Sequence, residues 1–407
     1  MLKLIPASEY CDNIFDGTHD TPKPKTEGKP LITSKHILKD RLDIANAYNI
    51  SFEDYNEINK RSRIRQWDIL FSMIGTIGNI YLEESNNINY AIKNMGVFSC
   101  GNEKKARYLY YYLQSNFAKQ YINQKLAGAV QKFLSLGELR SFPVPSFDEQ
   151  LYNSISILSW IDKKIELNNR INTELEVMAK ELYNYWFIQF DFPDEFRRPY
   201  KSSGGKMVYN DVLKREIPEG WEVKNLLDIV EWVSGAQPPK ATFIYQPQNG
   251  YVRFIQNRDY AGDTNVTYIK ESKNNKVCDV FDIMMDKYGD AGRVRYGLAG
   301  AYNVALSKIK VNVRYGQEYI RKFLESDSVY NYLYNACMAS TRASLNGEIL
   351  GNLNIAIPND TLLKNFEMRN KQIINQILQN KQENEILSNL RDFLLPMLMN
   401  GQVSVSD

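Results

Sequence analysis

The sequence predicts an α+β protein that is built twice from one plan. We expect two repeated globular domains of mixed strands and short helices, joined by two long helices that can pair with each other as a coiled coil. The prediction rests on an internal repeat of about 210 residues and on a long amphipathic segment that closes each half. Solenoid repeats are roughly 20–50 residues long, so a repeat of this length indicates a duplicated domain.

The repeat is clearest where glycines recur at equal spacing. Residues 67–79, WDILFSMIGTIGN, align with residues 281–293, FDIMMDKYGDAGR, at an offset of 214 residues. Here a turn or a close approach of the backbone to a partner would need glycine, although an ordinary tight turn between two core strands is the alternative. The other aligned pairs are LITSKHI at 31–37 with FIQNRDY at 254–260, DGTHDTPK at 16–23 with SGAQPPK at 234–240, and Val144-Pro145 with Ile357-Pro358.

The repeat and the turn residues divide the chain into five segments. They are a first domain at 1–147, a long helix at 148–190, a linker at 191–220, a second domain at 221–360 and a second long helix at 361–402. Prolines and glycines interrupt every periodic pattern in the linker. Inside the domains, short apolar stretches predict strands at 29–32, 68–74 and 142–144, and Tyr and Leu at helical spacing predict helices at 108–121 and 319–334.

Apolar residues alternate at steps of three and four in both closing segments, which is the pattern of a coiled-coil seam. In the first they are Leu151, Ile155, Leu158, Ile161, Ile165, Ile171, Leu175, Met178, Leu182 and Tyr185, with Asn168 at an interior step. In the second they are Phe366, Ile373, Ile377, Leu387, Leu390, Leu394 and Met397, with Asn380 and Asn384 at interior steps. Asparagine in a seam lowers stability but specifies register and orientation. Ordinary bundle helices are the alternative.

The composition excludes several classes of protein. With 50 Lys and Arg against 48 Asp and Glu, the 407 residues carry a formal net charge of +2, which excludes a polycation of the histone kind. No stretch approaches the roughly 18 uncharged apolar residues of a membrane span, and no secretory signal is present, so we expect a cytoplasmic protein. The four cysteines, Cys11, Cys100, Cys278 and Cys337, are far apart and are expected to be reduced.

The motifs of several catalytic sites are missing from the sequence. There is no ATP-binding P-loop, no GxGxxG turn after a strand, and no Asn or Asp followed by Pro-Pro and an aromatic residue, as in amino-methyltransferases. His19 and His36 are the only histidines. Asp282, Asp286 and Lys287 come nearest to a nuclease cluster, but the first half has no counterpart. We therefore expect no catalytic residue, metal or bound cofactor, with Asp282 capping a turn and Lys287 contacting backbone phosphate.

Two copies of one domain on a rigid rod would hold two recognition surfaces at a set separation. About 36–40 helical residues make a rod of roughly 55–60 Å, and one turn of duplex DNA is about 34 Å, so the domains could occupy successive major grooves. The aligned loops carry polar residues suited to base edges or phosphates, yet these residues differ between the halves. One scaffold that reads two different sequences would need this. For any single residue, a solvated loop is the alternative.

The order of further motifs completes a family pattern. After Val144-Pro145 come FDEQ and IDKKIELNNRINTELEVMAKELYNYWF, then YKSSGGKMVYN, IPEGWEVKNL and finally LRDFLLPMLMNGQV. Together with the duplicated loops, these stretches make the chain resemble the DNA-specificity subunit of type I restriction-modification systems over essentially its full length. The second half departs from the pattern, with NDTLL at 359–363 where the first half has FDEQ.

The resemblance implies a non-catalytic subunit with two target-recognition domains in head-to-tail repeat. Each domain would read one half of a split, asymmetric sequence in double-stranded DNA. The long helices would pack antiparallel as a spacer, which would give the chain pseudo-twofold symmetry. They would also dock two modification subunits that bind S-adenosylmethionine and methylate adenine. Restriction subunits that use ATP and magnesium would join the complex. The missing catalytic motifs agree with this division of labour.

Matching positions in the two halves yields a set of DNA-contact candidates. In the first half they are Thr18, His19, Lys23, Thr33, Ser34, Lys35, Gly75, Thr76, Gly78, Gln131 and Lys132. In the second half they are Gln237, Lys240, Gln256, Asn257, Arg258, Lys287, Tyr288, Gly289, Asp290, Gly292, Arg293, Thr341 and Arg342. Arg258, Arg293 and Arg342 could read guanine bidentately, which is worth roughly 1–3 kcal/mol of discrimination each.

Two other functions stay open at this point. In one, the coiled coil is a protein-interaction scaffold, which a purified complex without sequence-dependent DNA affinity would favour. In the other, the chain itself cleaves or methylates DNA, which activity of the isolated chain would favour.

Overall fold

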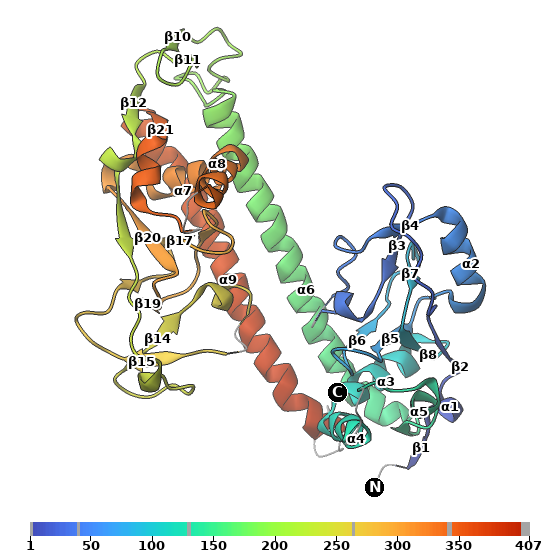
Figure 1. Ribbon diagram of the computed structural model, residues 1–407. Coiled ribbons are helices and arrows are strands. Elements are labelled where there is room, and N and C mark those ends of the chain that lie inside the picture. The colour runs from blue at the N-terminus through green and yellow to red at the C-terminus, as the bar shows by residue number, and fades with distance from the viewer. Residues whose placement is uncertain (1–2, 39–40, 128–131, 263–264, 340–343, 400–407) are drawn as a thin grey trace. The chain divides into compact units, whose positions relative to one another are not determined.

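The computed structural model describes residues 3–38, 41–127, 132–262, 265–339 and 344–399 (Figure 1). The chain divides into two compact units, one formed by Met1–Leu167 with Glu383–Asp407 and the other by Asn168–Gln382. Two long helices, α6 (Glu149–Tyr183) and α9 (Asp360–Met399), contribute residues to both units. No helix in the described part of the chain is both long and apolar enough to cross a membrane.

The first unit contains two small sheets above a closing strand pair. The closing pair is β1 (Leu4–Pro6) with β9 (Pro143–Pro145). One sheet has the order β2 (Asn13–Asp16), β8 (Met95–Ser99), β5 (Asp68–Ser72), β6 (Ile80–Leu82), and the other has the order β4 (Asn49–Ile50), β3 (Lys29–Ile32), β7 (Ala91–Ile92). The helices are α1 (Ala7–Tyr10), η1 (Ser34–His36), α2 (Phe52–Ser62), α3 (Glu103–Gln114), α4 (Asn116–Leu126) and α5 (Leu136–Arg140).

The second unit repeats most of this plan. Its closing pair is β12 (Glu222–Asn225) with β21 (Asn354–Ile357). Its sheets are β13 (Val230–Ser234), β20 (Leu306–Val311), β17 (Ile283–Asp286), β18 (Val294–Arg295), and β15 (Tyr268–Lys270), β14 (Tyr251–Ile255), β19 (Gly300–Tyr302), β16 (Val277–Cys278). The helical segments are η3 (Leu226–Asp228), η4 (Lys240–Thr242), η5 (Asn257–Tyr260), η6 (Val313–Tyr315), α7 (Gln317–Glu325), α8 (Asp327–Met338) and η7 (Gly347–Asn352). The predicted α+β fold with a duplicated domain is confirmed.

Strand register shows that the duplication holds residue by residue. The parallel pair β3–β7 places Leu31 opposite Ala91, and the parallel pair β14–β19 places Phe254 opposite Ala301. The units differ in several helical segments and in one strand. The first unit has the helix α2 between β4 and β5, whereas the second has the short strand β16 between β15 and β17.

Each unit has an aromatic-rich core in which the two long helices take part. In the first unit, Tyr108 and Tyr111 of α3 and the edge-to-face pair Phe71 and Phe98, 5.9 Å apart, pack in the same core as Ile155 of α6. In the second unit, the core rings include those of Phe187, Tyr319 and Phe366. Burial of these rings joins the recognition sheets to the long helices.

The helices predicted at 108–121 and 319–334 are each two helices. Both segments break at a serine, Ser115 between α3 and α4 and Ser326 between α7 and α8. The side chain of Ser115 accepts a hydrogen bond from the backbone N–H of Ala118, which is the geometry of a helix N-cap. The periodic tyrosines hide this break because the core face continues across it.

The segment expected to be a linker at 191–220 is folded. A π-helical turn, η2 (Asn184–Ile188), follows α6, and β10 (Met207–Asn210) pairs with β11 (Arg215–Pro218). The ring of Phe192 stacks on Tyr200 at 4.7 Å and on Trp221 at 5.5 Å, and Asp191 accepts hydrogen bonds from Ser202. The prolines and glycines interrupt helical periodicity, but they do not prevent an aromatic cluster from ordering the segment.

The two long helices run antiparallel in each unit. In the second unit, Asn172 of α6 meets Asn380 of α9, while the later residue Tyr183 meets the earlier residue Phe366. In the first unit, Asp162 pairs with Arg391 at 2.9 Å and Lys164 pairs with Glu383 at 3.2 Å. Residue numbers rise along α6 as they fall along α9, as an antiparallel coiled coil requires.

The seam departs from the predicted residues after Asn168. Asn172 and Ala179 are buried, whereas the predicted Ile171 and Met178 are exposed, Met178 by 55%. In α9, Arg391 lies in the seam and the predicted Leu390 is exposed. After Asn168, the alternation of three-residue and four-residue steps requires a step of four, which leads to Asn172. The seam position therefore falls on this polar residue and not on its apolar neighbour. Of the other predicted seam residues in the sequence-based set, Ile155, Leu158, Asn168, Phe366, Ile377 and Asn380 are buried, and Leu151, Ile165, Leu175, Leu182, Ile373, Asn384, Leu387 and Leu394 are partly buried.

Asn172→Ala is expected to destabilise the second unit by about 1–3 kcal/mol, because it leaves the buried amide of Asn380 without its acceptor. The Nδ2 of Asn380 donates to the Oδ1 of Asn172 at 2.8 Å. Replacing both asparagines by leucine should recover this loss, since a buried apolar pair needs no hydrogen bond. Urea denaturation of Asn172→Leu, Asn380→Leu and the variant with both leucines measures the coupling. Additive losses in the double variant would contradict a direct contact.

Candidate nucleic-acid interface

In the first unit, three predicted DNA-contact loops meet around Asn94. The backbone N–H of Asn94 donates to the carbonyl of Thr18, and its side-chain Oδ1 lies 2.9 Å from the Nδ1 of His19. The hydroxyl of Ser34 donates to the carbonyl of Asn94. The side chain of Asn79, which ends the glycine turn, donates to the carbonyl of Ile37. The chain therefore brings these separate loops to one surface.

The second unit gathers the equivalent loops around residues 303–305. The N–H of Ala236 donates to the carbonyl of Tyr302, and the N–H of Asn303 donates to the carbonyl of Ile255. The N–H of Lys287 donates to the carbonyl of Ala305, which ties the glycine turn to the same loop. The predicted loops after β13, β14 and β17 are thus neighbours here too.

Gly17 and Gly235 occupy the same place in the two turns and leave no room for a side chain. A Cβ on Gly17 would lie 2.5 Å from the carbonyl oxygen of Ile92, and one on Gly235 would lie 1.9 Å from that of Asn303. Real Cβ atoms do not approach a backbone oxygen so closely. These glycines let each turn pack directly on the following loop, which positions Thr18 and His19 in one unit and Gln237 in the other.

A short helical cap presents the second group of candidates in each unit. Thr33 and His36 form a reciprocal capping box at η1, and Gln256 and Asp259 form one at η5. Asp259 is buried and accepts the backbone N–H of Gln256 at 2.9 Å, while 56% of the Arg258 side chain is exposed, with its Nε 3.6 Å from Asp259. The cap holds the backbone and turns Arg258 outward.

The four glycines at matching positions of the two glycine turns have two different roles. All four have positive φ, between +72° and +90°. A Cβ on Gly75 or Gly289 would meet nothing within 4 Å, whereas one on Gly292 would lie 2.8 Å from the Cβ of Leu333 in α8. Gly78 approaches Ile122 of α4 in the same way. The first glycine of each turn therefore lies at an open tip, and the second packs the turn on a helix.

Gly292→Ala is expected to destabilise the second unit more than Gly289→Ala does. Both variants force alanine into a left-handed backbone conformation, at about 1–2 kcal/mol. Gly292→Ala adds the clash with Leu333, whose Cβ cannot move without its helix, at about 1–3 kcal/mol more. Urea denaturation of both variants measures the difference. Equal losses would show that α8 yields at no cost.

The glycine turn of the second unit carries a charged network that the first unit lacks. Asp286 is buried and accepts from the Nε and Nη2 of Arg295 at 3.1 and 2.9 Å. Asp290 accepts from the hydroxyl of Tyr330, and its Oδ2 lies 4.0 Å from the Nε of Arg293. At the matching positions, the first unit has Ser72 for Asp286, Thr76 for Asp290, Asn79 for Arg293 and Tyr81 for Arg295. The two turns share a backbone but offer different side chains.

Burial raises the pKa of Asp286 to about 6, although Arg295 opposes the shift. Because this pKa lies above the ordinary value, the folded state binds the proton more tightly than the unfolded state does. The stabilising contribution is complete below about pH 4 and is lost as the pH rises through 6. Asp286→Asn removes this titration. The stability of the native chain relative to this variant is therefore expected to fall by about 3 kcal/mol between pH 4 and pH 7.5. Urea denaturation across that range checks it, and a pH-independent difference would contradict it.

The remaining candidates are exposed or lie outside the described residues. The side chains of Lys23, Lys35, Lys132, Gln237 and Lys240 are exposed. The segment of Lys132 runs beside the glycine turn, because the N–H of Leu134 donates to the carbonyl of Met73, and the N–H of Leu345 donates to Lys287 in the same way. The other candidates of these two segments, Gln131, Thr341 and Arg342, lie outside the described residues.

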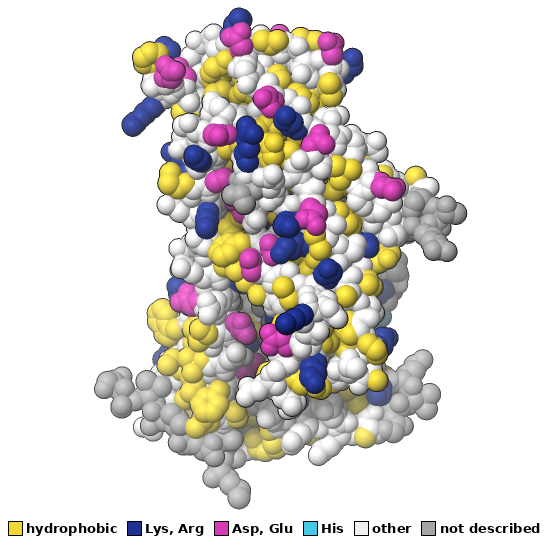
Figure 2. All heavy atoms as spheres, turned by 90° about the vertical axis from the view of Figure 1, so that its left-hand side faces the viewer, with side chains coloured by type: hydrophobic (Ala, Val, Ile, Leu, Met, Phe, Trp, Pro, Cys, Tyr) yellow, Lys and Arg dark blue, Asp and Glu magenta, His cyan; other side chains and the backbone are white. Residues whose placement is uncertain are grey.

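Charges are interspersed on the face of the molecule shown in Figure 2. Lys and Arg side chains alternate there with Asp and Glu, and hydrophobic side chains lie between them. A field of one sign is therefore absent from that face, and nucleic-acid affinity would have to come from local contacts.

No cluster of metal ligands lies among the described residues. Within them, no group of three or more His, Cys, Asp and Glu side chains could hold a metal ion. The Oδ2 of Asp282 accepts from the backbone N–H of Asp279 at 2.8 Å and pairs with Lys308 at 2.7 Å, so Asp282 closes a turn as predicted. The four cysteines are buried free thiols.

Sequence reasoning missed Asn79, Asn94 and Asn303, which connect the loops. Asn94 has a φ of +52°, and asparagine is among the few residues that tolerate this conformation. Asn94 begins an Asn-Met-Gly stretch, but its partners lie 60 or more residues away in the sequence.

The family assignment follows from comparison with known proteins. The family model described as "Type I restriction modification DNA specificity domain" matches residues 18–177 and 218–392. The chain belongs to this family. Each matched range contains one set of the loops described above and most of one long helix, so the duplicated specificity domain corresponds to the duplicated fold.

Relatives within the specificity-domain family share most of their length with this chain. The type I restriction enzyme MjaIX specificity subunit of Methanocaldococcus jannaschii is 27% identical over 320 residues, covering 74% of this chain and 70% of the relative. The type I restriction enzyme HindI specificity subunit of Haemophilus influenzae is 24% identical over 407 residues, covering 84% and 88%. The type I restriction-modification S subunit of M. genitalium has the same fold, with a TM-score of 0.59 and 13% identity over 98% of this chain and 96% of that chain.

Proposed function

We propose that this chain reads a bipartite, asymmetric sequence in double-stranded DNA, one half with each unit. Membership of the specificity-domain family supports the role in DNA recognition. The observation that carries the bipartite reading is the duplicated interface: each unit brings matching loops together on the same backbone, yet the side chains differ. One scaffold with two sets of side chains suits two different half-sites.

The chain also positions two adenine-methylating modification subunits and, where they are present, restriction subunits. Exposed apolar side chains on the long helices support a docking role. Trp160 and Met178 of α6 and Ile386 and Phe393 of α9 are each more than half exposed. Contiguous patches of such side chains mark interaction surfaces. S-adenosylmethionine, ATP and magnesium are then used by those partners, and this chain determines the DNA sequence on which they act.

Methylation mapping tests the proposal in one experiment. The chain is co-expressed with the modification subunit encoded beside it, in a host free of DNA methylation, and methylated adenines are mapped across the genome by single-molecule sequencing. A split asymmetric motif with one methylated adenine on each strand is expected. An assembled complex that methylates nothing with cofactor present would instead favour a protein-interaction scaffold.

A further inference from the structure

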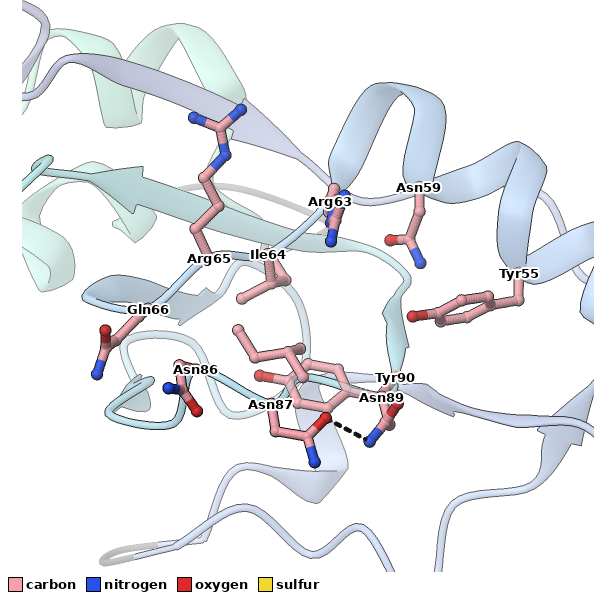
Figure 3. Close-up of a pocket in the computed structure, with 11 residues that line it drawn as sticks. Tyr55, Asn59, Arg63, Ile64, Arg65, Gln66, Asn86, Asn87, Asn89 and Tyr90 are labelled. Carbon is pink, nitrogen blue, oxygen red and sulfur yellow. Dashed lines mark hydrogen bonds between the residues drawn. The ribbon is translucent and has the colours of Figure 1, made fainter.

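A polar cleft of about 540 Å³ lies in the first unit (Figure 3). It forms between the end of α2 with the segment that follows it and the loop between β6 and β7. Its lining includes five carboxamide side chains, those of Asn59, Gln66, Asn86, Asn87 and Asn89, together with Arg63 and Arg65. None of the residues that line it is acidic.

The arginines of the cleft belong to a short basic run. Lys60, Arg61, Arg63 and Arg65 fall within six residues, at the end of α2 and just after it. Arg63 and Arg65 are exposed, and within the described residues neither forms an ion pair. Figure 3 shows the Arg65 side chain extending away from the loop that carries Asn86 and Asn87. Unpaired guanidinium groups at the rim of a cleft without acids favour an anionic ligand.

The carboxamides give the cleft many hydrogen-bond donors. Asn87 accepts from the Nδ2 of Asn89 at 3.1 Å, and Lys29 reaches Asn89 from the neighbouring strand. Asn59 extends from α2 toward the gap, and its Oδ1 is buried without a hydrogen-bond partner. Arg, Lys, Asn, Gln and Tyr are the side chains that proteins use on the phosphates and sugars of DNA.

The basic run is fastened to a predicted reading turn. The Nη2 of Arg61 donates to the Oδ1 of Asp16 at 3.2 Å and to the carbonyl of Gly17 at 3.3 Å. The same carboxylate lies 3.0 Å from His19. Arg61 thus ties the end of α2, from which the cleft begins, to the turn that carries Thr18 and His19.

We propose that this cleft holds the sugar-phosphate backbone beside the first half-site, so that the first unit contacts more phosphates than the second. The inference rests on the proposed function. The second unit lacks an equivalent of this arrangement, because it has β16 between β15 and β17 where the first unit has α2 between β4 and β5. Val277 and Asp279 occupy the positions that match Arg63 and Arg65. The cleft supplies affinity without sequence information, and the neighbouring loops supply the discrimination.

The test is the salt dependence of DNA binding by the full chain with its modification subunit. Affinities are measured for a duplex carrying the mapped motif and for a scrambled duplex. In the Arg63→Ala/Arg65→Ala variant, the slope of log affinity against log salt is expected to fall by about 2, equally on both duplexes, with the methylated motif unchanged. Arg63→Lys/Arg65→Lys keeps the charges and should keep the slope. Lys273→Ala/Lys276→Ala, which removes two exposed cations from the corresponding region of the second unit, is the matched control and should leave the slope unchanged.

Each other outcome bears on one proposal at a time. A slope equal to that of the native complex, or a changed motif, would overturn the backbone role of the cleft. Failure of the variant to co-purify with its modification subunit would make the cleft a protein-docking site and overturn it too. If the native complex binds both duplexes equally, and the salt slope still falls by about 2 in the variant, the proposed sequence reading is contradicted. The cleft proposal then stands.

Discussion

Replacing residues 226–353 with the equivalent segment of another family member is expected to change one half of the methylated motif and leave the other half intact. The segment lies between β12 and β21, whose register from Glu222–Ile357 to Asn225–Asn354 closes the domain. The exchange therefore removes every described loop of the second interface and keeps its base. Methylation mapping of the chimaera reads both halves at once.

Two features of the core decide how the exchange should be made. The ring of Tyr319 lies inside the exchanged segment and packs on Phe187 and Phe366, which stay behind. The donor should therefore carry an aromatic residue at this position, since losing a buried ring costs about 3–5 kcal/mol. The matching exchange of residues 7–142, between β1 and β9, is the control and should change the other half. Simultaneous change of both halves in either chimaera would contradict independent reading.

Arg258→Ala is expected to relax recognition at one position of the second half-site, with a loss of roughly 1–3 kcal/mol of discrimination, or about 5-fold to 150-fold. The capping box of Gln256 and Asp259 holds the backbone without the Arg258 side chain, so the fold should survive. Binding to duplexes that carry each base in turn at every position of the half-site measures the effect. Arg258→Lys should not restore it, because lysine lacks the bidentate fork.

A neighbouring cation provides the control for Arg258. Lys310 is exposed on β20 of the same unit and pairs with Glu231 at 2.9 Å. Lys310→Ala removes the same charge without touching the reading loops, so it should leave discrimination unchanged. If Arg258→Ala weakened binding to every duplex equally and only lowered the salt slope, Arg258 would be a phosphate contact.

Local patterns predicted those parts of the fold that depend on neighbours in the chain. The strands at 29–32 and 68–72 follow from apolar stretches bounded by turn residues, and the glycine pairs follow from turns that need positive φ. The break at Ser115 escaped prediction because the tyrosines on both sides face one core. The folded segment at 191–220 escaped it because its stability comes from rings that stack across the segment, such as Phe192 on Tyr200 and Trp221.

The candidate interface divides in the same way. Residue type and position in the repeat singled out Thr18, Ser34 and Arg258 from the sequence. Asn94, the run from Lys60 to Arg65, and the cleft were missed, because their importance lies in contacts with distant loops. A loop residue that connects other loops has no periodic signature.

The sequence by itself determined that one domain plan occurs twice and that a long helix closes each copy, because strand punctuation, turn glycines and apolar periodicity are local properties. Only the tertiary structure decided which residues of those helices face each other and which loops share a surface. Asn172 lies in the seam in place of Ile171 and pairs with Asn380, 208 residues away in the sequence. No local pattern encodes that pairing.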